Sequence, residues 1–305
     1  MPTPTSSLTS CGPMATACGR WCPTLRPRWP CARACGRAKD LVYAKVRLVA
    51  QLRAHLALVF PGAVGLFDRL DSPIAEAFLT RFPSAERAAW LSPRRFESWL
   101  ARAGYPGHRS GAELHARLIA APAGVSGEGA GTLAAVTLGY VRAITALREQ
   151  ITELETRIAE QLADHPDGAI FTSLPRSGSV RAATLLAEIG DCRERFPSPE
   201  ALICLAGAAP STRQSGQHRA VTFRYACDKK LRDALTDFAA DSRFGNDWAA
   251  DIYGRARARG KRHPHAVRIL ARAWLYVIWR CWLDRVPYDP ERHQALQRLT
   301  LARAA

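Results

Sequence analysis

Acidic residues are scarce in this 305-residue chain and are missing altogether from its first 39 residues. The chain has 27 Asp and Glu against 43 Lys and Arg, which gives a formal net charge of +16. A field of that sign attracts polyanions, and nucleic acid is the commonest polyanion that a basic soluble protein meets. Nucleic acid is therefore the first candidate partner, and an anionic membrane surface is the second.

Long uncharged apolar runs are missing as well. A membrane-spanning helix needs about 20 consecutive apolar residues, and the longest candidate, residues 271–283, is interrupted by Arg272 and Arg280. The first residues show no basic segment followed by an apolar core, so the sequence predicts no secretory signal peptide. We therefore expect a cytoplasmic protein with no membrane partner.

Cysteine is abundant at one place only. Five of the nine cysteines fall within the first 35 residues, and two pairs of them share a three-residue gap. Structural zinc sites more usually have two-residue gaps flanking a hairpin, and this segment has no nearby histidine and no strand or helix period. A zinc-binding regulator is thus the last of the functions considered, and we expect no metal site there.

Hydrophobic periodicity predicts a mainly α fold. At 48% apolar and 23% charged residues, the chain has the composition of a globular protein over most of its length. Residues 1–38 have no period and are predicted to be a disordered tail. Residues 39–164 are predicted to be a helical middle region, residues 165–285 a compact helical DNA-binding domain, and residues 286–305 a second tail.

The middle region has clear helix start and stop signals. Apolar residues at spacings of three and four over 41–59 predict an amphipathic helix that ends at Pro61-Gly62. Ser72-Pro73 and Ser92-Pro93 are predicted starts of further short helices, because Ser suits the N-cap and Pro the first helical position.

A long helix is predicted over residues 132–163. Its apolar residues alternate three and four apart, as in a coiled-coil seam, at Ile144, Leu147, Ile151, Leu154 and Ile158. The seam covers little more than two heptads. Packing on a neighbour within the chain and pairing with a second copy in a homo-oligomer therefore both stay open.

The turn Arg176-Ser177-Gly178 opens the C-terminal domain and precedes an apolar helix. It resembles the helix-hairpin-helix motif, in which helix-start N–H groups point at a DNA phosphate. That motif usually has a glycine and an aliphatic residue where this chain has Arg176 and Ser177. An ordinary helical turn is the alternative.

Positive charge is concentrated between residues 213 and 272, where fourteen Lys and Arg face six Asp and Glu, a net +8 that is half of the chain's formal charge. Acids are absent after Asp251 up to Arg272. A run of charges is often only a solvated face, but one without interleaved acids favours phosphate contacts. With the turn at 176–178, the candidate nucleic-acid-binding residues are Arg176, Ser177, Gly178, Arg213, His218, Arg219, Arg224, Lys229, Lys230, Arg257, Arg259, Lys261 and Arg262.

Four blocks in this half of the chain carry a specific resemblance: LPRSGSVRAATLLAEIGD, RFPSPEALICLAGAAPSTRQSG, DKKLRDAL and YGRARARGKRHPHAVRILARAW. Their order and spacing resemble the C-terminal transposase domain of the insertion-sequence-110 family. The segment FPGAVGLFDRLDSPIAEAFLTRFPS is similar to that family's helical middle, so the resemblance covers roughly residues 40–285.

The resemblance implies a DNA recombinase, or transposase, that is guided by a structured RNA from its own element. Family members combine an N-terminal RNase H-like domain, whose acidic tetrad binds Mg²⁺, with a catalytic serine in the C-terminal domain. By motif that serine is Ser215. A serine suits strand exchange because a phosphoserine ester stores the energy of the cleaved bond.

The hydroxyl of Ser215 needs help from its neighbours. Arg213, His218, Arg219 and Arg224 are the sequence-local candidates for stabilising charge on the attacked phosphate. On the residues alone, an ordinary exposed turn serine beside glycine is by far the commoner interpretation of Ser215. Its catalytic assignment therefore depends on the resemblance.

The beginning of the chain departs from the family. A full member has about a hundred more residues before Lys39, including the acidic tetrad, so we expect no cofactor ligands in this chain. The opening residues Met1 to Pro4 match a family stretch Asp-Ala-Asp-Ala read one base out of frame. We therefore expect a truncated or mis-started transposase of impaired activity, with a non-catalytic nucleic-acid-binding remnant as the alternative; translating the upstream DNA in the other frame checks this.

Overall fold

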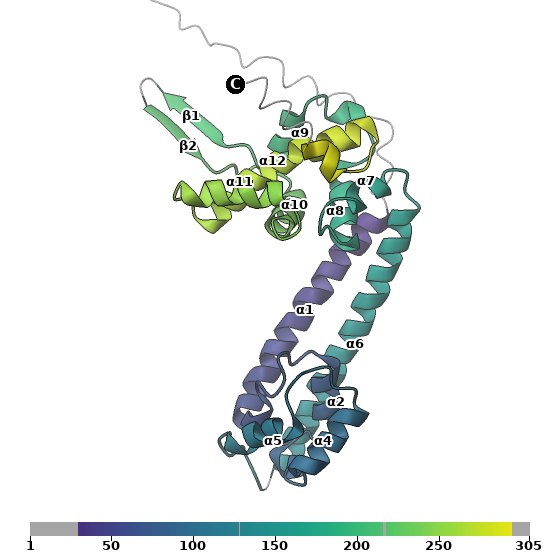
Figure 1. Ribbon diagram of the computed structural model, residues 1–305, viewed down its shortest axis with the longest axis vertical. Coiled ribbons are helices and arrows are strands. Elements are labelled where there is room, and N and C mark those ends of the chain that lie inside the picture. The colour runs from purple at the N-terminus through teal and green to yellow at the C-terminus, as the bar shows by residue number, and fades with distance from the viewer. Residues whose placement is uncertain (1–29, 128, 216–217, 295–305) are drawn as a thin grey trace, which may run out of the picture. The chain divides into compact units, whose positions relative to one another are not determined.

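The computed structural model describes residues 30–127, 129–215 and 218–294. Within these ranges the chain is mainly α, as predicted, with a single two-stranded antiparallel ribbon (Figure 1). Most of the predicted tail at 1–38, and the end of the tail at 286–305, lie outside the described residues. The chain divides into a middle unit, Gly36–Arg157, and a C-terminal unit, Met1–Cys35 with Ile158–Ala305.

The first helix, α1, spans Pro30–Val59 and starts within the segment that the sequence assigned to a tail. Pro30 suits a first helical position, and the alanines that follow have the highest helix propensity of any residue. Cys35 and Ala38 are buried. Residues 30–38 therefore correct the expectation of disorder, while the predicted end of the helix before Pro61 is confirmed.

Serine caps organise the short helices of the middle unit. Ser72, Ser84, Ser92 and Ser110 each accept a hydrogen bond from a backbone N–H three residues on, and Ser110 forms a full capping box with Glu113. These bonds satisfy helix-start donors that would otherwise lack partners. The helices are η2 (Pro61–Ala63), α2 (Pro73–Arg81), α3 (Ala85–Ala88), α4 (Pro93–Arg102) and α5 (Gly111–Ala120).

Phe78 of α2 lies at the centre of the middle unit's core. Its ring is 1% exposed and lies 5.3–6.2 Å, centroid to centroid, from five other aromatic rings. Those rings belong to Phe60, Phe67, Phe82, Phe96 and Trp99. Aromatic burial on this scale dominates the energetics of a core, and it joins α2 and α4 to the end of α1.

Helix α6 spans Ala130–Ala163, which confirms the predicted long helix. By length and composition alone it could cross a membrane, because one 18-residue stretch has a mean hydropathy of 1.4. The sequence prediction above did not include this stretch. Core helices of folded domains share these properties. The hydroxyl of Thr145 and the guanidinium of Arg148 bind Glu76 of α2 at 3.0 and 2.9 Å, so α6 packs into the middle unit.

Asp71 joins α1 to the start of α2. Arg69 binds its carboxylate through Nε (3.0 Å) and Nη2 (2.8 Å), and Lys45 of α1 lies 3.1 Å from it. The hydrogen bonds from Arg69, followed by the contact with Lys45, lower the pKa of Asp71 to about 2. The carboxylate is therefore charged and bound to both cations at neutral pH.

We expect Asp71→Asn to lower the thermal midpoint of unfolding at pH 7. Because the folded pKa is about 2 and the unfolded pKa about 3.9, the stabilisation from this carboxylate is complete above pH ~4 and is lost as the pH falls toward 2. The deficit of the variant should shrink over that interval in circular-dichroism melts. Asp68→Asn, whose side chain is 89% exposed, is the control and should change little; a deficit of Asp71→Asn that is independent of pH would contradict this account.

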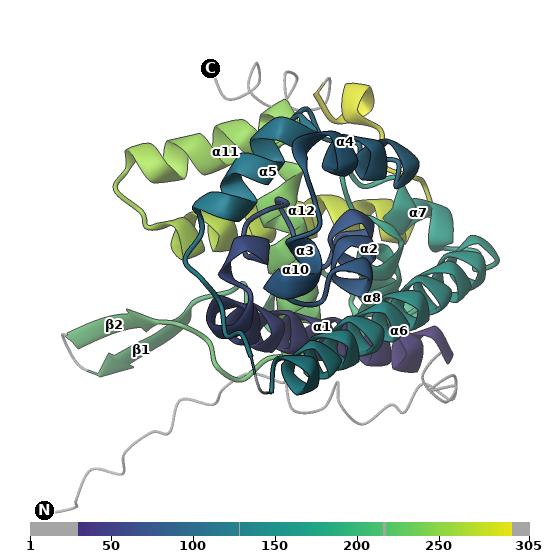
Figure 2. The same cartoon turned by 90° about the horizontal axis from the view of Figure 1, so that it is seen from below.

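The C-terminal unit consists of short helices followed by the ribbon and three longer helices. Its elements are α7 (Gly168–Thr172), α8 (Ser179–Ile189), η3 (Arg193–Arg195), α9 (Pro199–Leu205), β1 (Ser211–Ser215), β2 (His218–Thr222), α10 (Lys229–Ser242), α11 (Asp247–Ala258) and α12 (His263–Asp284). Figures 1 and 2 both show the ribbon projecting from the helices of this unit.

Helix α12 is the core of the C-terminal unit. Trp274 and Trp282 are fully buried, and each indole N–H has a partner on another element: Ser242 Oγ of α10 at 2.8 Å and the carbonyl of Gly190 at 2.8 Å. Buried indoles need such acceptors because an unpaired buried N–H is costly. Beyond the helix, Tyr288 is also buried and its backbone N–H donates to Ser173 Oγ at 2.7 Å, so the described start of the final segment packs against the unit.

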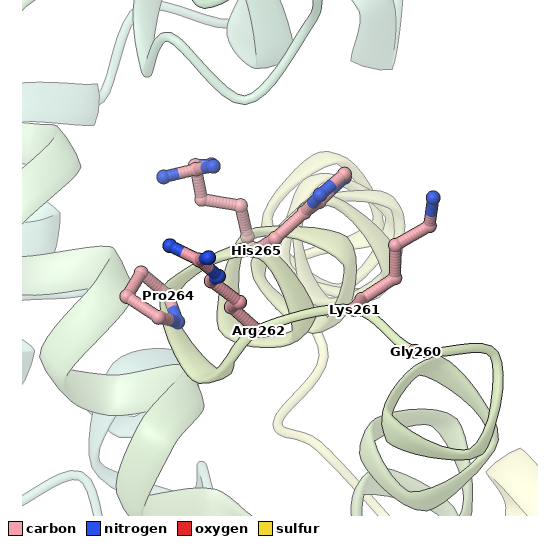
Figure 3. A pocket seen from close by; sticks show the side chains of 6 residues that line it. Gly260, Lys261, Arg262, Pro264 and His265 are labelled. Atoms are coloured by element: carbon pink, nitrogen blue, oxygen red, sulfur yellow. The ribbon is translucent and has the colours of Figure 1, made fainter.

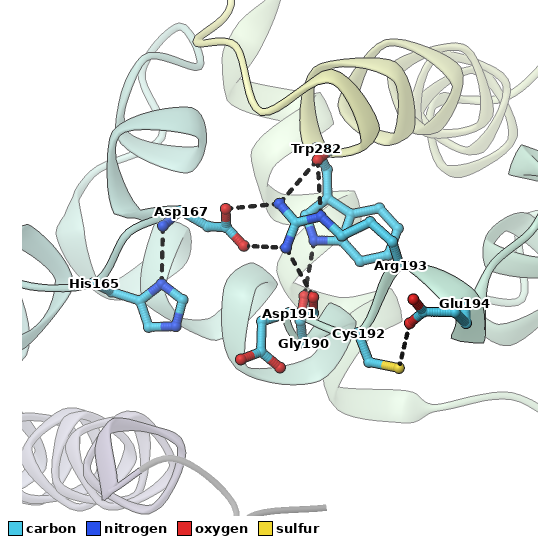
Figure 4. A network of polar contacts seen from close by, with 8 residues as sticks. All are labelled: His165, Asp167, Gly190, Asp191, Cys192, Arg193, Glu194 and Trp282. Atoms are coloured by element: carbon cyan, nitrogen blue, oxygen red, sulfur yellow. Dashed lines mark hydrogen bonds and ion pairs between the residues drawn. The ribbon is translucent and has the colours of Figure 1, made fainter. Parts of the chain in front are cut away.

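An ion pair between the half-buried Arg193 and the buried Asp167 connects the start of this unit to α12 (Figure 4). Arg193 donates to both carboxylate oxygens of Asp167, at 2.5 and 2.6 Å, and to the carbonyl of Trp282 at 2.9 Å. Its guanidinium also lies over the Trp282 ring, 4.8 Å from the centroid. Asp167 is 4% exposed, so Arg193 is what neutralises its charge.

Candidate nucleic-acid interface

The predicted binding residues all belong to the C-terminal unit, where they fall on three structural features. Arg213, Ser215, His218 and Arg219 lie in the ribbon. Arg224, Lys229 and Lys230 follow it and lead into α10. These residues form the first feature, the ribbon with the segment that follows it. The second feature is the α11–α12 turn, with Arg257, Arg259, Lys261 and Arg262. The third is the α7–α8 turn, with Arg176, Ser177 and Gly178.

Strands β1 and β2 correct the interpretation of Ser215 as an ordinary turn serine. The strands pair antiparallel with Ser211 opposite Thr222 and Ser215 opposite His218. The signal was available, since two five-residue runs with Thr and Val lie on either side of a two-residue connection that contains Gly216, the usual pattern of a hairpin. The serine of the family motif thus stands at the end of a strand.

The register of the ribbon gives each residue its cross-strand neighbour. Ser215 pairs with His218, Arg213 with Ala220 and Gln214 with Arg219. Ser215 is exposed, as a nucleophile for a large polymer substrate must be. His218, as its cross-strand partner, is the nearest titratable residue by register.

Lysines 229 and 230 form the exposed start of α10. Positive side chains in a first turn are opposed by the helix dipole, and this turn has no acidic residue apart from its N-cap, Asp228, which accepts from the N–H of Leu231 at 3.0 Å. Nearby, the buried Nε of Arg224 has no hydrogen-bond partner within the described residues. At the base of the ribbon, Lys229 and Lys230 are therefore open to a ligand, and Arg224 has a hydrogen-bond donor without a partner among the described residues.

Aromatic rings and guanidinium groups meet at the same place. Phe223 and Tyr225 contact edge to face, with centroids 4.9 Å apart. The guanidinium groups of Arg232 and Arg268 lie over the Phe223 ring at 5.4 and 5.0 Å. Tyr225 is 78% exposed. This group is not apparent from the sequence, because Arg268 comes 45 positions after Phe223 and only the fold brings them together.

A small open pocket lies at the α11–α12 turn (Figure 3). Gly260 makes the turn with φ = +74°, and the pocket is lined by Gly260, Lys261, Arg262, Pro264, His265 and Arg268. No acidic residue lines it. Desolvation, and then the charges of Arg268 and Lys261, lower the pKa of His265. The turn is thus a site of uncompensated positive charge, with Arg257, Arg259 and Lys261 all exposed around it.

The α7–α8 turn differs from the simple phosphate loop that its sequence suggested. Arg176 adopts φ = +57° and Gly178 φ = +65°. Both are exposed, whereas Ser177 is 3% exposed and its hydroxyl has no partner among the described residues. Arg181 holds the turn by donating to the carbonyl of Arg176 (3.0 Å) and to Asp241 (2.8 Å). Arg176 and Gly178 are therefore the residues of this turn that a ligand can reach.

Taken together, these features define a helical unit with a projecting ribbon and a strongly basic surface. Residues 168–254 match the family described as Transposase IS116/IS110/IS902, so this part of the C-terminal unit is similar to the transposase domain of that family. This confirms the resemblance found in the sequence. The match includes the ribbon with Ser215, helix α10 and most of α11.

Curated relatives agree with the family match. The "Mini-circle putative transposase for IS117" of Streptomyces coelicolor is 29% identical over 265 residues, which cover 83% of this chain and 63% of that protein. The "Insertion element IS110 uncharacterized 43.6 kDa protein" of the same organism is 34% identical over 53% of this chain and 40% of its own length. An IS900 protein of Mycobacterium paratuberculosis is 32% identical over 52% of the chain. The chain thus spans less than two thirds of the length of these relatives.

Proposed function

We propose that this chain acts in DNA transposition, and that the basic surface of its C-terminal unit holds DNA while Ser215 is the nucleophile of strand cleavage. The observation that carries the proposal is the family match over residues 168–254, a range that includes Ser215. The exposure of Ser215 at the end of β1 supports it. Charge supports the same conclusion, since residues 213–272 hold half of the chain's net +16.

The proposed reaction is a transesterification. The Oγ of Ser215 attacks phosphorus, an Oγ–P bond forms, and one P–O bond of the DNA backbone breaks. The proton of the hydroxyl passes to a base, for which His218 is the candidate by register, and the departing strand leaves as a DNA hydroxyl. Reversal of the same step with a new strand reseals the backbone without an external energy source.

The resemblance to the family implies Mg²⁺ for the cleavage step. In phosphoryl transfer a bound metal supplies charge stabilisation for the attacked phosphate. The described residues contain no group of three or more His, Cys, Asp or Glu side chains that could hold a metal ion, and residues 1–39 have no acid. These residues do not fit a Mg²⁺ site, so we assign no step to the metal.

The poor fit of these residues to a Mg²⁺ site favours a second candidate function, a nucleic-acid-binding chain that does not cleave DNA by itself. In either case we propose DNA as the substrate and a structured guide RNA as a partner by resemblance to the family. We also propose that two copies can pair through the apolar seam of α6. We propose a cytoplasmic location as well.

Replacing Arg257, Arg259 and Lys261 by Ala together is expected to weaken binding to duplex DNA on the order of 100-fold at ~0.1 M salt. Each contact between a basic side chain and a phosphate releases a condensed counterion from the DNA, and this release favours binding. The triple variant loses the release that comes from its missing contacts. The measurement is fluorescence anisotropy with a labelled duplex.

Arg81, Arg94 and Arg102, all exposed on the middle unit, give a matched control. Their replacement by Ala changes the net charge by the same amount but should weaken binding only a few-fold. Equal losses in the two triple variants would mean that binding follows overall charge and not this surface.

A further inference from the structure

We propose that the base of the ribbon and the α11–α12 turn together bind one unpaired nucleotide, with its base stacked on Tyr225 and its phosphate in the basic pocket. The inference rests on the proposed nucleic-acid binding and specifies the form of nucleic acid that this place takes. The residues that carry it come from two segments: Phe223 and Tyr225 after β2, and Lys261, Arg262, His265 and Arg268 at the start of α12.

Tyr225 has the properties of a stacking platform. With 78% of its surface exposed, it is the most exposed large apolar or aromatic side chain among the described residues. Phe223 supports it edge to face at an interplanar angle of 83°, and the guanidinium groups of Arg232 and Arg268 hold Phe223 in turn. The ring is therefore buttressed from one side and open to solvent over most of its area. Exposed, supported aromatic rings beside cations are how proteins stack the bases of single strands.

The pocket has the properties of a phosphate site. It has a volume of about 360 Å³ and four basic side chains in its lining. None of these four forms an ion pair with an acid in the described parts of the chain, in contrast to Arg255 nearby, which binds Asp251 at 2.8 Å. The lowered pKa of His265, which comes from desolvation and then from Arg268 and Lys261, is consistent with this crowding of positive charge. A phosphate entering the pocket would relieve the crowding.

Arg268 connects the two halves of the proposed site. Its guanidinium lies 5.0 Å from the Phe223 centroid, and Arg268 is also one of the residues that line the pocket. The Phe223 ring is 4.9 Å from that of Tyr225. The platform and the pocket are thus adjacent, as the base and phosphate of one nucleotide are. In a duplex both faces of each base are covered by stacked neighbours, so only an unpaired nucleotide can stack on Tyr225 while its phosphate occupies the pocket.

The test compares Tyr225→Ala with the unaltered chain on three labelled probes of one sequence: single-stranded DNA, single-stranded RNA and duplex DNA. We expect about a 5- to 100-fold weaker affinity for single strands and less than a twofold change for the duplex. Tyr225→Trp should restore single-strand binding, because stacking needs an aromatic face and not the hydroxyl. Arg268→Gln should also weaken single-strand binding and flatten its salt dependence by about one unit.

Phe244 provides the matched control. It is also on the surface of the C-terminal unit, with 67% of its area exposed, but the guanidinium of Arg243 covers its ring at 4.3 Å. Phe244→Ala should therefore leave single-strand binding unchanged.

If Tyr225→Ala loses affinity for the RNA probe alone, the nucleotide belongs to a guide RNA. If it loses affinity for the single-stranded DNA probe alone, the nucleotide belongs to a melted DNA strand. A loss of affinity for both single strands means that the site accepts either. The inference is overturned if Tyr225→Ala binds single strands like the unaltered chain, or if it loses duplex affinity equally. If the unaltered chain binds none of the probes, the proposed function itself fails, which is a separate result.

Discussion

Ser215→Ala is expected to abolish every covalent link between the protein and DNA while leaving DNA binding unchanged. The hydroxyl is the only group that the substitution removes, and a phosphoserine bond cannot form without it. Because Ser215 is exposed at the end of β1, its loss costs the fold little. The measurement is retention of end-labelled DNA on the protein in a denaturing gel, beside a native gel that reports binding.

The assay needs two forms of the protein. For the 305-residue chain with Mg²⁺ we expect binding without retention, since neither residues 1–39 nor the described residues supply a metal site. For a fusion that places an acidic RNase H-like domain of the family ahead of Lys39, we expect retention that Ser215→Ala removes.

Ser211→Ala is the matched control, because Ser211 lies on the same strand but at the opposite end of the ribbon, across from Thr222. It should retain DNA normally in the fusion. Retention by the 305-residue chain itself, lost on Ser215→Ala, would show that the serine site is sufficient by itself and would overturn the second candidate function. Retention by the Ser215→Ala fusion would exclude Ser215 as the nucleophile.

Arg193→Ala is expected to destabilise the C-terminal unit by about 3–5 kcal/mol, the usual cost of leaving one charge of a buried pair without its partner. Asp167 is 4% exposed and both its oxygens accept from Arg193. The variant also loses the bond to the carbonyl of Trp282 and the stacking on that ring. Urea unfolding followed by tryptophan fluorescence measures the loss, since Trp282 is at the site.

Two controls separate this pair from charge in general. Arg280→Ala breaks the ion pair with Asp284 on the surface of α12, where the Arg280 side chain is 68% exposed, and should cost less than ~1 kcal/mol. Combining Arg193→Met with Asp167→Leu removes both charges and should recover much of the loss. A double variant as unstable as Arg193→Ala would show that packing by the arginine matters more than its charge.

Local signals made the helices predictable. Ser72 and Ser92 each cap a helix by bonding to a backbone N–H only three residues further on, and a proline follows each serine at the first helical position. The seam from Ile144 to Ile158 lies within the single helix α6. The ribbon at 211–222 also had a local signal, but Ser215-Gly216 was taken as an isolated turn. The family match then confirmed the resemblance that the four sequence blocks carried.

The remaining features depend on long-range contacts. Asp167 and Arg193 are 26 positions apart, and Arg193 and Trp282 are 89 apart; each residue by itself reads as an ordinary member of a turn or helix. The same holds for Arg268, which completes both the Phe223 stack and the basic pocket. A sequence shows which residues are charged or aromatic, but their grouping into a site is a property of the fold.

The central claim, that the C-terminal unit is a nucleic-acid interface, is tested most directly by the salt dependence of DNA binding by the unaltered chain. With about six phosphates neutralised, the logarithm of the association constant should fall against the logarithm of salt concentration with a slope of about −5 or steeper. Replacing Arg257, Arg259 and Lys261 by Ala should flatten that slope by about 2 to 3 units. A slope near zero in the unaltered chain, or one that the triple substitution leaves unchanged, would contradict the claim.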